Sequence, residues 1–271
     1  MTNYRNEMSI EDIRHFAPSA FATEPYHAQS GRYTFIPTSD VISGLREAGF
    51  VPVSASQSRT RIADKKDFTK HMLRFRSLQS FNTLAVVGES IVEVVLINAH
   101  DGTSRYKLMG GVFRFVCSNG MVVADSLLAA VSIRHTGNII DEVIAGTQHV
   151  FEQAPKILDV IGKWQSVELS TNEQLALATS AHRLRFEEKE GEKQTGITPE
   201  MLLAPRRRDD AGNSLWNTFN RIQENTTKGI RTFSNGERVT SRAVKSISND
   251  VRLNRALWTR AEAMAELKGL L

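Results

Sequence analysis

Three histidines and one aspartate are the residues of this sequence best suited to metal binding or general-base chemistry. They are His71, His100, Asp101 and His135. Imidazole and carboxylate groups ligate zinc, and a neutral imidazole accepts protons near neutral pH. No H-E-x-x-H or C-x-x-C spacing occurs, so a site would require these side chains to converge in the fold. We expect no resident metal or cofactor and no catalytic residue, and we keep these four residues as the metal candidates.

Positive charge is concentrated in two parts of a chain whose net charge is +4 and whose pI is near 9.3. Residues 206–255 include eleven Arg or Lys and five Asp or Glu, and residues 51–110 include nine and five. The intervening residues 111–205 include eight and twelve. A partitioned basic surface is typical of proteins that bind phosphate backbones, although solvated helix faces have the same composition.

The first basic region predicts a basic sheet face. Period-two alternation places Lys70, Arg74 and Arg76 on one side of a strand, which faces solvent if the other side packs on helices. Arg105 and Lys107 share a face of another strand. Such a sheet beside a basic helix would form a charged groove.

The second basic region contains a run of three arginines at 206–208, just before a predicted helix. The helix dipole disfavours cations there, so these arginines either pair with Asp209 and Asp210 or bind an anion. Phe233 is a candidate stacking residue among cations, although a core or lid role also fits. The candidates for nucleic-acid contact in this region are Arg206, Arg207, Arg208, Lys228, Arg231, Arg238, Arg242, Lys245 and Arg252.

The elements that must position these residues change in character near residue 140. Before it, strand-like runs alternate with turn signals; after it, apolar residues recur with a helical period. We predict an α+β fold in which an N-terminal antiparallel sheet backed by helices (1–140) precedes a mainly helical portion with a basic surface (141–271). The two regions are expected to form one integrated domain. Strands are predicted at 32–37, 50–62, 70–76, 91–97, 104–109, 112–117 and 121–123, and helices at 9–16, 41–48, 143–162, 172–186, 209–228 and 241–267.

Composition places the chain among ordinary globular proteins, with 41% hydrophobic and 24% charged residues. No apolar run approaches the ~20 residues of a membrane helix, so no membrane partner is expected. The N-terminal residues are polar and lack the apolar core of a signal peptide. Cys117 is the only cysteine and reads as a small core residue. We expect a cytoplasmic protein without an internal disulfide.

Several phrases occur together along nearly the whole chain. They include Thr69 to Arg74, Asn98 to Ser104, Phe113 to Gly120, Arg134 to Asn138, Pro205 to Arg208, Gln223 to Asn225 and Leu253 to Trp258. With them the chain resembles the uncharacterised prophage- and plasmid-borne proteins of the YafZ/YfjQ type, a family of unknown function. The resemblance implies an origin in a mobile genetic element and supplies no active site.

Three hypotheses follow for function. The first is binding of DNA, single-stranded or otherwise sequence-nonspecific, in recombination, annealing or maintenance of the element. The sheet-then-helix order is similar to phage single-strand annealing proteins, and that analogy implies a homo-oligomer. The second is an interaction protein that inhibits a host defence protein. The third is a metal-dependent enzyme acting on nucleic acid.

Overall fold

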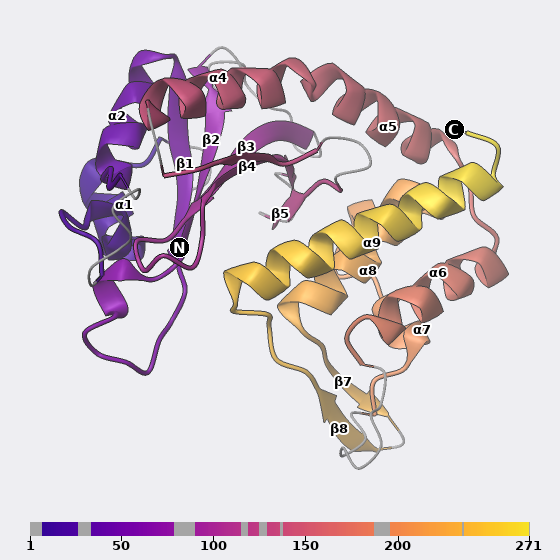
Figure 1. Ribbon diagram of the computed structural model, residues 1–271. Coiled ribbons are helices and arrows are strands. Elements are labelled where there is room, and N and C mark those ends of the chain that lie inside the picture. Colours follow the sequence, from indigo (N-terminus) through magenta and orange to yellow (C-terminus); the bar gives the residue numbers. More distant parts are fainter. Residues whose placement is uncertain are drawn as a thin grey trace. The chain divides into compact units, whose positions relative to one another are not determined.

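The computed structural model describes residues 7–26, 34–78, 90–114, 119–124, 129–135, 138–186, 196–234 and 236–270. The chain forms two compact units, Met1–Pro155 and Lys156–Leu271. The first unit carries an antiparallel sheet with helices, and the second is mainly helical, so the predicted α+β class is confirmed (Figure 1).

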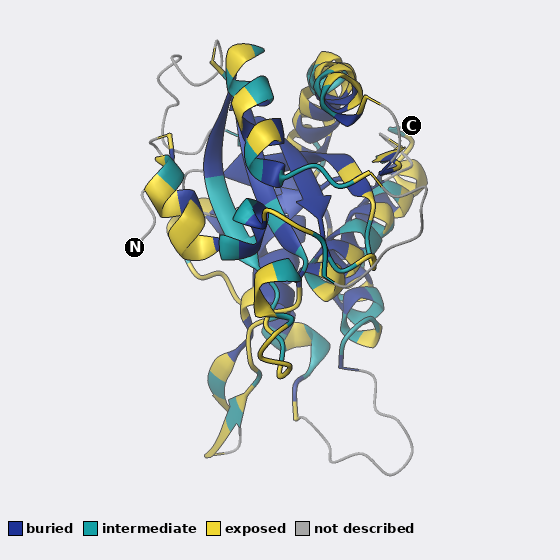
Figure 2. Ribbon diagram, turned by 60° about the vertical axis from the view of Figure 1, so that its left-hand side comes forward, coloured by how far each residue is buried: buried dark blue, intermediate teal, exposed yellow. Residues whose placement is uncertain are grey.

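The sheet of the first unit is antiparallel throughout, in the order β1-β2-β3-β4-β5, with β6 also paired to β4. Its strands are β1 (Phe50–Gln57), β2 (His71–Ser77), β3 (Ser90–Asn98), β4 (Tyr106–Arg114), β5 (Asn119–Val122) and β6 (Val131–Ile133). β6 was not predicted. The central strands β3 and β4 are buried over most of their length (Figure 2), which the apolar run Val94 to Ile97 favours in β3.

Strand β4 joins two runs that were predicted as separate strands. Gly110 and Gly111 lie within it, opposite Val94 and Glu93 of β3. At Gly111 an added Cβ would lie 2.8 Å from Val95 Cγ2, so the absence of a side chain here permits close packing. The end of the strand predicted at 112–117, which includes Cys117, is outside the described residues.

Helices back this sheet as predicted. They are α1 (Ile10–Phe16), the 3-10 helices η1 (Pro18–Phe21) and η2 (Lys66–Phe68), α2 (Thr38–Glu47) and α4 (Ile139–Glu152). Gly146 brings α4 close to the sheet, since an added Cβ would lie 2.6 Å from Leu108 Cδ1. The strand predicted at 32–37 is wrong in its described part, because residues 34–37 form no strand and lead directly into α2.

The second unit consists of α5 (Ala154–Ser166), α6 (Thr171–Arg183), α7 (Pro199–Leu202), η3 (Arg208–Asp210), α8 (Leu215–Lys228), β7 (Arg231–Ser234), β8 (Glu237–Thr240) and α9 (Ile247–Leu267). α5 begins two residues before the unit boundary. Four aromatic rings form part of the core of this unit: Trp164 lies 4.6 Å from Trp258 and 5.4 Å from Phe219, and Trp216 stacks on Phe219 at 5.7 Å between centroids. They join α5, α8 and α9.

Three boundaries differ from the sequence prediction for physical reasons. The helix predicted at 143–162 is two helices, because Pro155 lacks the N–H that a continuous helix needs and fits only a first turn. Ser214, and neither Asp209 nor Asp210, caps α8 by accepting a hydrogen bond from the backbone N–H of Asn217. The predicted loop around Phe233 is the hairpin of β7 and β8.

None of the described helices combines the length and the apolar character that crossing a membrane requires.

Candidate nucleic-acid interface

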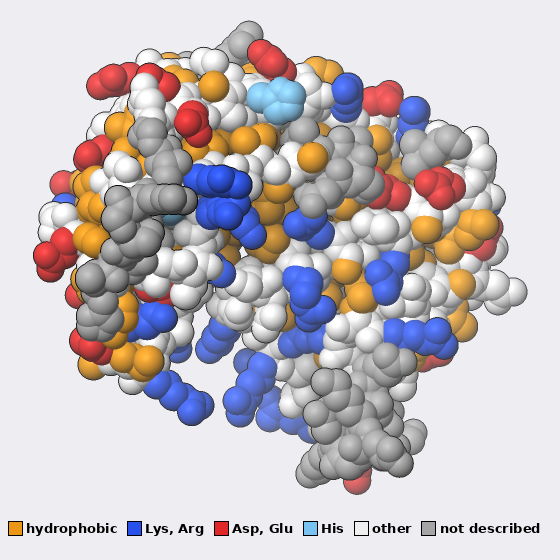
Figure 3. All heavy atoms as spheres, in the orientation of Figure 1, with side chains coloured by type: hydrophobic (Ala, Val, Ile, Leu, Met, Phe, Trp, Pro, Cys, Tyr) orange, Lys and Arg blue, Asp and Glu red, His pale blue; other side chains and the backbone are white. Residues whose placement is uncertain are grey.

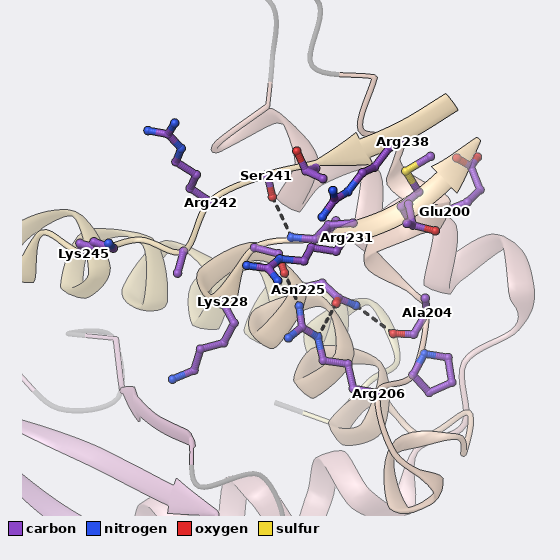
Figure 4. Close-up of a pocket in the computed structure, with 17 residues that line it drawn as sticks. Glu200, Ala204, Arg206, Asn225, Lys228, Arg231, Arg238, Ser241, Arg242 and Lys245 are labelled. Atoms are coloured by element: carbon purple, nitrogen blue, oxygen red, sulfur yellow. Dashed lines mark hydrogen bonds between the residues drawn. The ribbon is translucent and has the colours of Figure 1, made fainter. Parts of the chain in front are cut away.

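An open pocket of about 1290 Å³ lies within the second unit, and six of the described residues that line it are Arg or Lys (Figure 4). Glu200 is the one acidic residue among those that line it. The lining cations are Arg206, Lys228, Arg231, Arg238, Arg242 and Lys245. The fold therefore gathers six of the predicted contact residues, which span 40 positions of sequence, around one space.

The junction between α8 and the hairpin brings these cations together. Gly229 ends α8 with φ +80° and ψ 169°, a backbone conformation that is close to glycine-only. An added Cβ there would lie 2.4 Å from Ser241 O, so the chain after β8 crosses this glycine at close range. The Ser241 hydroxyl is 2.9 Å from the N–H of Ile230, and the Val244 N–H donates to Thr227 O at 2.8 Å. These bonds fix the segment that carries Arg242 and Lys245 against the end of α8.

Arg206 is held in place by the same junction. Its Nε donates to Asn225 Oδ1 at 2.8 Å, and its Nη2 donates to Gly229 O. The Asn225 amide in turn donates to Leu202 O at 3.0 Å and to Ala204 O at 2.9 Å. Arg206 thus caps the carbonyl end of α8 while its charge stays on the pocket wall, where the helix dipole favours a cation.

The other five cations of the pocket are exposed. Within the part of the chain that the structure describes, their side chains have no carboxylate partner and no hydrogen bond. In the close-up, Lys228 and Arg242 extend away from the backbone (Figure 4). Basic side chains are also prominent in the space-filling view (Figure 3). Cations crowded without counter-charges repel each other, and a bound polyanion would relieve that repulsion.

A smaller hollow of about 330 Å³ shares one lining residue, Lys245, with the pocket. It is lined further by Arg185, Asn249 and the exposed Arg252. Arg185 donates to the carbonyls of Thr226 and Arg242, and burial lowers its pKa. Lys245 and Arg252 are therefore the two cations of this hollow that a ligand can reach. Arg185 instead binds backbone carbonyls of the protein.

Two of the three consecutive arginines lie apart from the pocket lining. Arg207 forms a bidentate ion pair with Glu224, in which Nη2 lies 2.9 Å from Oε1. Its Nη1 also lies 3.5 Å from Asp210 Oδ2. Its pairing with an aspartate was one of the two predicted alternatives. Arg208 is exposed in η3. The segment precedes α8 by several residues, so the predicted conflict with that helix dipole does not arise.

The predicted exposure of Arg74 and Arg76 on the sheet is wrong. Both guanidinium groups are buried and bind one carboxylate, that of Glu93, at 3.0 Å and 2.6 Å. Gly120 makes room for them, since an added Cβ would lie 2.7 Å from Arg74 Cζ. Alternation places the two arginines on one face, but that face is buried here, and a buried cation requires a partner. They are structural residues and leave the set of contact candidates.

The other basic candidates of the first unit remain accessible. Arg105 and Lys107 are exposed, and Lys70 is half-buried. They belong to a different unit from the basic pocket.

The three candidate histidines converge, but in a buried polar cluster. Their rings are almost fully inaccessible, and His71 and His100 are 5.4 Å apart. The carboxylate of Asp101 instead forms an ion pair with Lys65 at 3.0 Å. The cluster is completed by Ser19, Thr38, Asn98 and Tyr106. Among the described residues, no three His, Cys, Asp or Glu side chains are arranged to hold a metal ion.

Thr38 is the centre of this cluster. His71 Nδ1 lies 3.3 Å from Thr69 O, which can only accept, so Nδ1 carries the proton and Nε2 accepts from the Thr38 hydroxyl at 2.9 Å. His100 Nε2 then donates to Thr38 at 3.1 Å, and its Nδ1, which has no partner among the described residues, is the unprotonated nitrogen. Each of these two rings is therefore neutral.

Burial keeps these rings neutral below neutral pH. It lowers the pKa of His71 to about 4 and that of His100 to about 3, with the neighbouring histidines adding to the second shift. Burial also lowers the pKa of His135, whose Nε2 lies 3.1 Å from Asn98 Oδ1. An inaccessible, mutually bonded cluster of this kind supports folding of the sheet and its helices and offers no surface for a substrate.

Sequence reasoning missed several residues that build the pocket. Asn225 and Ser241 form hydrogen bonds that hold the lining segments in place, and Glu200 lines the pocket. None of the three was predicted as a site residue. One signal was available for Asn225: the run Asn225-Thr226-Thr227 consists of poor helix formers at the end of a helix, which indicates that the side chains have specific partners.

Comparison with known proteins assigns the chain to a family. Residues 25–258 match the family described as "Domain of unknown function (DUF932)". Over 259 residues the chain is 39% identical to UPF0380 protein YafZ and 38% identical to UPF0380 protein YfjQ, both of Escherichia coli (strain K12). Each alignment covers 95% of this chain and 91% of the relative. No solved structure matches the chain significantly. The chain therefore belongs to the DUF932 family.

Proposed function

We propose that this protein binds DNA, preferably single-stranded and without sequence specificity, through the basic pocket of its second unit. The observation that carries the proposal is the convergence of six cations on one open pocket, five of them without a partner among the described residues. A DNA backbone supplies a regular series of phosphates that can neutralise such a group.

The chemistry of the pocket favours backbone contact over base reading. Five exposed Lys and Arg side chains present donors to phosphate oxygens, and such contacts position a nucleic acid without reading its sequence. The smaller hollow, which is lined by Lys245 and Arg252, offers a further cation close to the pocket. A flexible single strand can follow a path of this kind more easily than a stiff duplex can.

The cellular step is proposed from the resemblance to mobile-element proteins. Annealing, recombination or maintenance of such an element each require a protein that holds single strands without regard to sequence. Assembly into a homo-oligomer and a cytoplasmic location belong to the same proposal. A host defence protein as the partner remains a separate hypothesis, which no feature of the described residues favours.

Binding is tested by fluorescence anisotropy with a labelled oligothymidine of about 16 nucleotides and a duplex of the same length. Five phosphate contacts predict a salt slope near −3.5 for the single strand, hence about a hundredfold weaker binding at ~200 mM than at ~50 mM salt. Tighter binding of the single strand than of the duplex supports the preference. Absence of binding to either probe at the lower salt concentration refutes the proposed function.

A further inference from the structure

Phe233 is the most exposed phenylalanine among the described residues, with 73% of its surface accessible. It belongs to β7, in the hairpin that supplies two arginines to the basic pocket. A core or lid residue would be covered, and this ring is not. Exposure of a ring beside a ligand pocket points to a contact with the ligand.

The register of the hairpin places the ring on the same face as the pocket cations. Phe233 lies directly opposite Arg238, and Arg231 lies opposite Thr240. Residues opposite each other, and residues two apart along a strand, share a face. Arg231, Arg238 and Thr240 all line the pocket.

On the other face of the hairpin, Thr232 also lines the pocket, whereas Val239 faces a different part of the chain. Val239 lies against Gly196, where an added Cβ would be 3.7 Å from the valine side chain. The hairpin therefore has one face that carries Phe233 together with Arg231 and Arg238. This arrangement combines a stacking surface with donors for the flanking phosphates.

We propose that Phe233 stacks on an unpaired base of the strand whose phosphates bind Arg231 and Arg238. This inference rests on the proposed function. It assigns to Phe233 the preference for single strands over duplexes. In a duplex each base face is already stacked on its neighbours, so the ring can contribute only to a strand whose bases are free. Every base has such a face, so stacking adds affinity without sequence preference.

The test compares Phe233→Ala with the unchanged protein on three probes: an oligothymidine, an abasic oligomer of the same length and a duplex. Loss of one stacked base predicts about five- to hundredfold weaker binding to the oligothymidine. Binding to the abasic oligomer and the duplex is expected to stay the same, because no cation is lost. For the same reason the salt slope is unchanged, and Phe233→Trp restores affinity.

Phe16→Ala is the matched control, since Phe16 is a partly exposed phenylalanine (41%) of the first unit. Unchanged affinity of Phe233→Ala for oligothymidine overturns the inference, and so does an equal loss on all three probes. In either case, salt-dependent binding by the unchanged protein still supports DNA binding as the proposed function. If the unchanged protein binds none of the probes, both proposals fail.

Discussion

Arg206, Arg207 and Arg208 are adjacent in sequence but have different environments. Arg206 is held by Asn225 and Gly229 at the pocket wall, Arg207 pairs with Glu224 and Asp210, and Arg208 is exposed. Reversing the charge of all three therefore changes stability together with any ligand binding. Each residue needs its own variant.

Arg207→Ala is expected to destabilise the fold. It removes a cation from the side chains of Glu224 and Asp210, which are only 7% and 2% exposed. A buried carboxylate that loses a partner costs free energy; we expect a loss of about 1–3 kcal/mol in the free energy of unfolding, because Arg207 is itself partly exposed. Urea unfolding measures this loss. Arg208→Ala is the control and should change stability by less than about 0.5 kcal/mol; equal effects of the two variants would contradict the assignment.

The buried histidines predict a loss of stability in mild acid. His71 and His100 remain neutral in the fold down to a pH of about 4 and 3, whereas histidines of the unfolded chain take up protons near pH 6.5. As pH falls below ~6.5 the unfolded state gains protons that the folded state excludes, so the free energy of unfolding falls by about 1.4 kcal/mol per pH unit for each ring. Above ~6.5 these rings contribute no pH dependence.

Urea unfolding at a series of pH values between neutrality and mild acid checks this sign. His149→Gln is the control, because His149 is exposed on α4 and its replacement should leave the pH dependence unchanged. Stability that stays constant through the acid range would contradict a neutral, buried histidine cluster.

Among the elements, the junction of α8 with β7 matters most for the pocket. Gly229→Ala forces a side chain into a glycine-only conformation and places its Cβ 2.4 Å from Ser241 O and 2.8 Å from Arg242 C. Because both contacts are to backbone, the segment that carries Arg242 and Lys245 must move. We expect a loss of more than about 2 kcal/mol in the free energy of unfolding, accompanied by weaker DNA binding.

Gly162→Ala is the matched control for this substitution. Gly162 lies in α5, and an added Cβ there meets nothing within 4 Å. Alanine is favoured over glycine in a helix, so this variant should gain about 0.5–1 kcal/mol. Thermal or urea unfolding of the two variants separates them; a neutral Gly229→Ala would show that the crossing at Ser241 is not required.

The sequence predicted elements well where one period dominated. Apolar residues alternate with a period of two in the strands between Phe50 and Val122, and they recur with the helical period in α6 and α8. These periods distinguish strand from helix, because burial of one face of each element requires them. The cap at Ser214 was missed because Asp209 and Asp210 are nearby residues of a type that also caps helices. The hairpin at Phe233 was missed although Asn235-Gly236 is a sequence typical of hairpin turns. Local signals do not decide between competing caps and turns; tertiary packing does.

At the scale of the whole molecule, the small net charge of +4 conceals a segregated distribution. Charge counts along the sequence identified the basic C-terminal third, and six of its predicted residues line one pocket. The same counts could not distinguish these exposed cations from Arg74 and Arg76, which are neutralised by Glu93. That distinction depends on which residues strand pairing brings together across the sheet, and composition carries no such information.

The salt dependence of single-strand binding tests the central claim most directly. Anisotropy titrations with oligothymidine would compare the unchanged protein, Lys228→Gln, Lys245→Gln and the double variant. Lys156→Gln is the control, since Lys156 is exposed on α5 and lies outside the pocket lining. Each pocket variant should weaken binding and reduce the magnitude of the salt slope by about 0.7, and the double variant by about 1.4, with no change for the control. Equal slopes for all five proteins would contradict binding of DNA at this pocket.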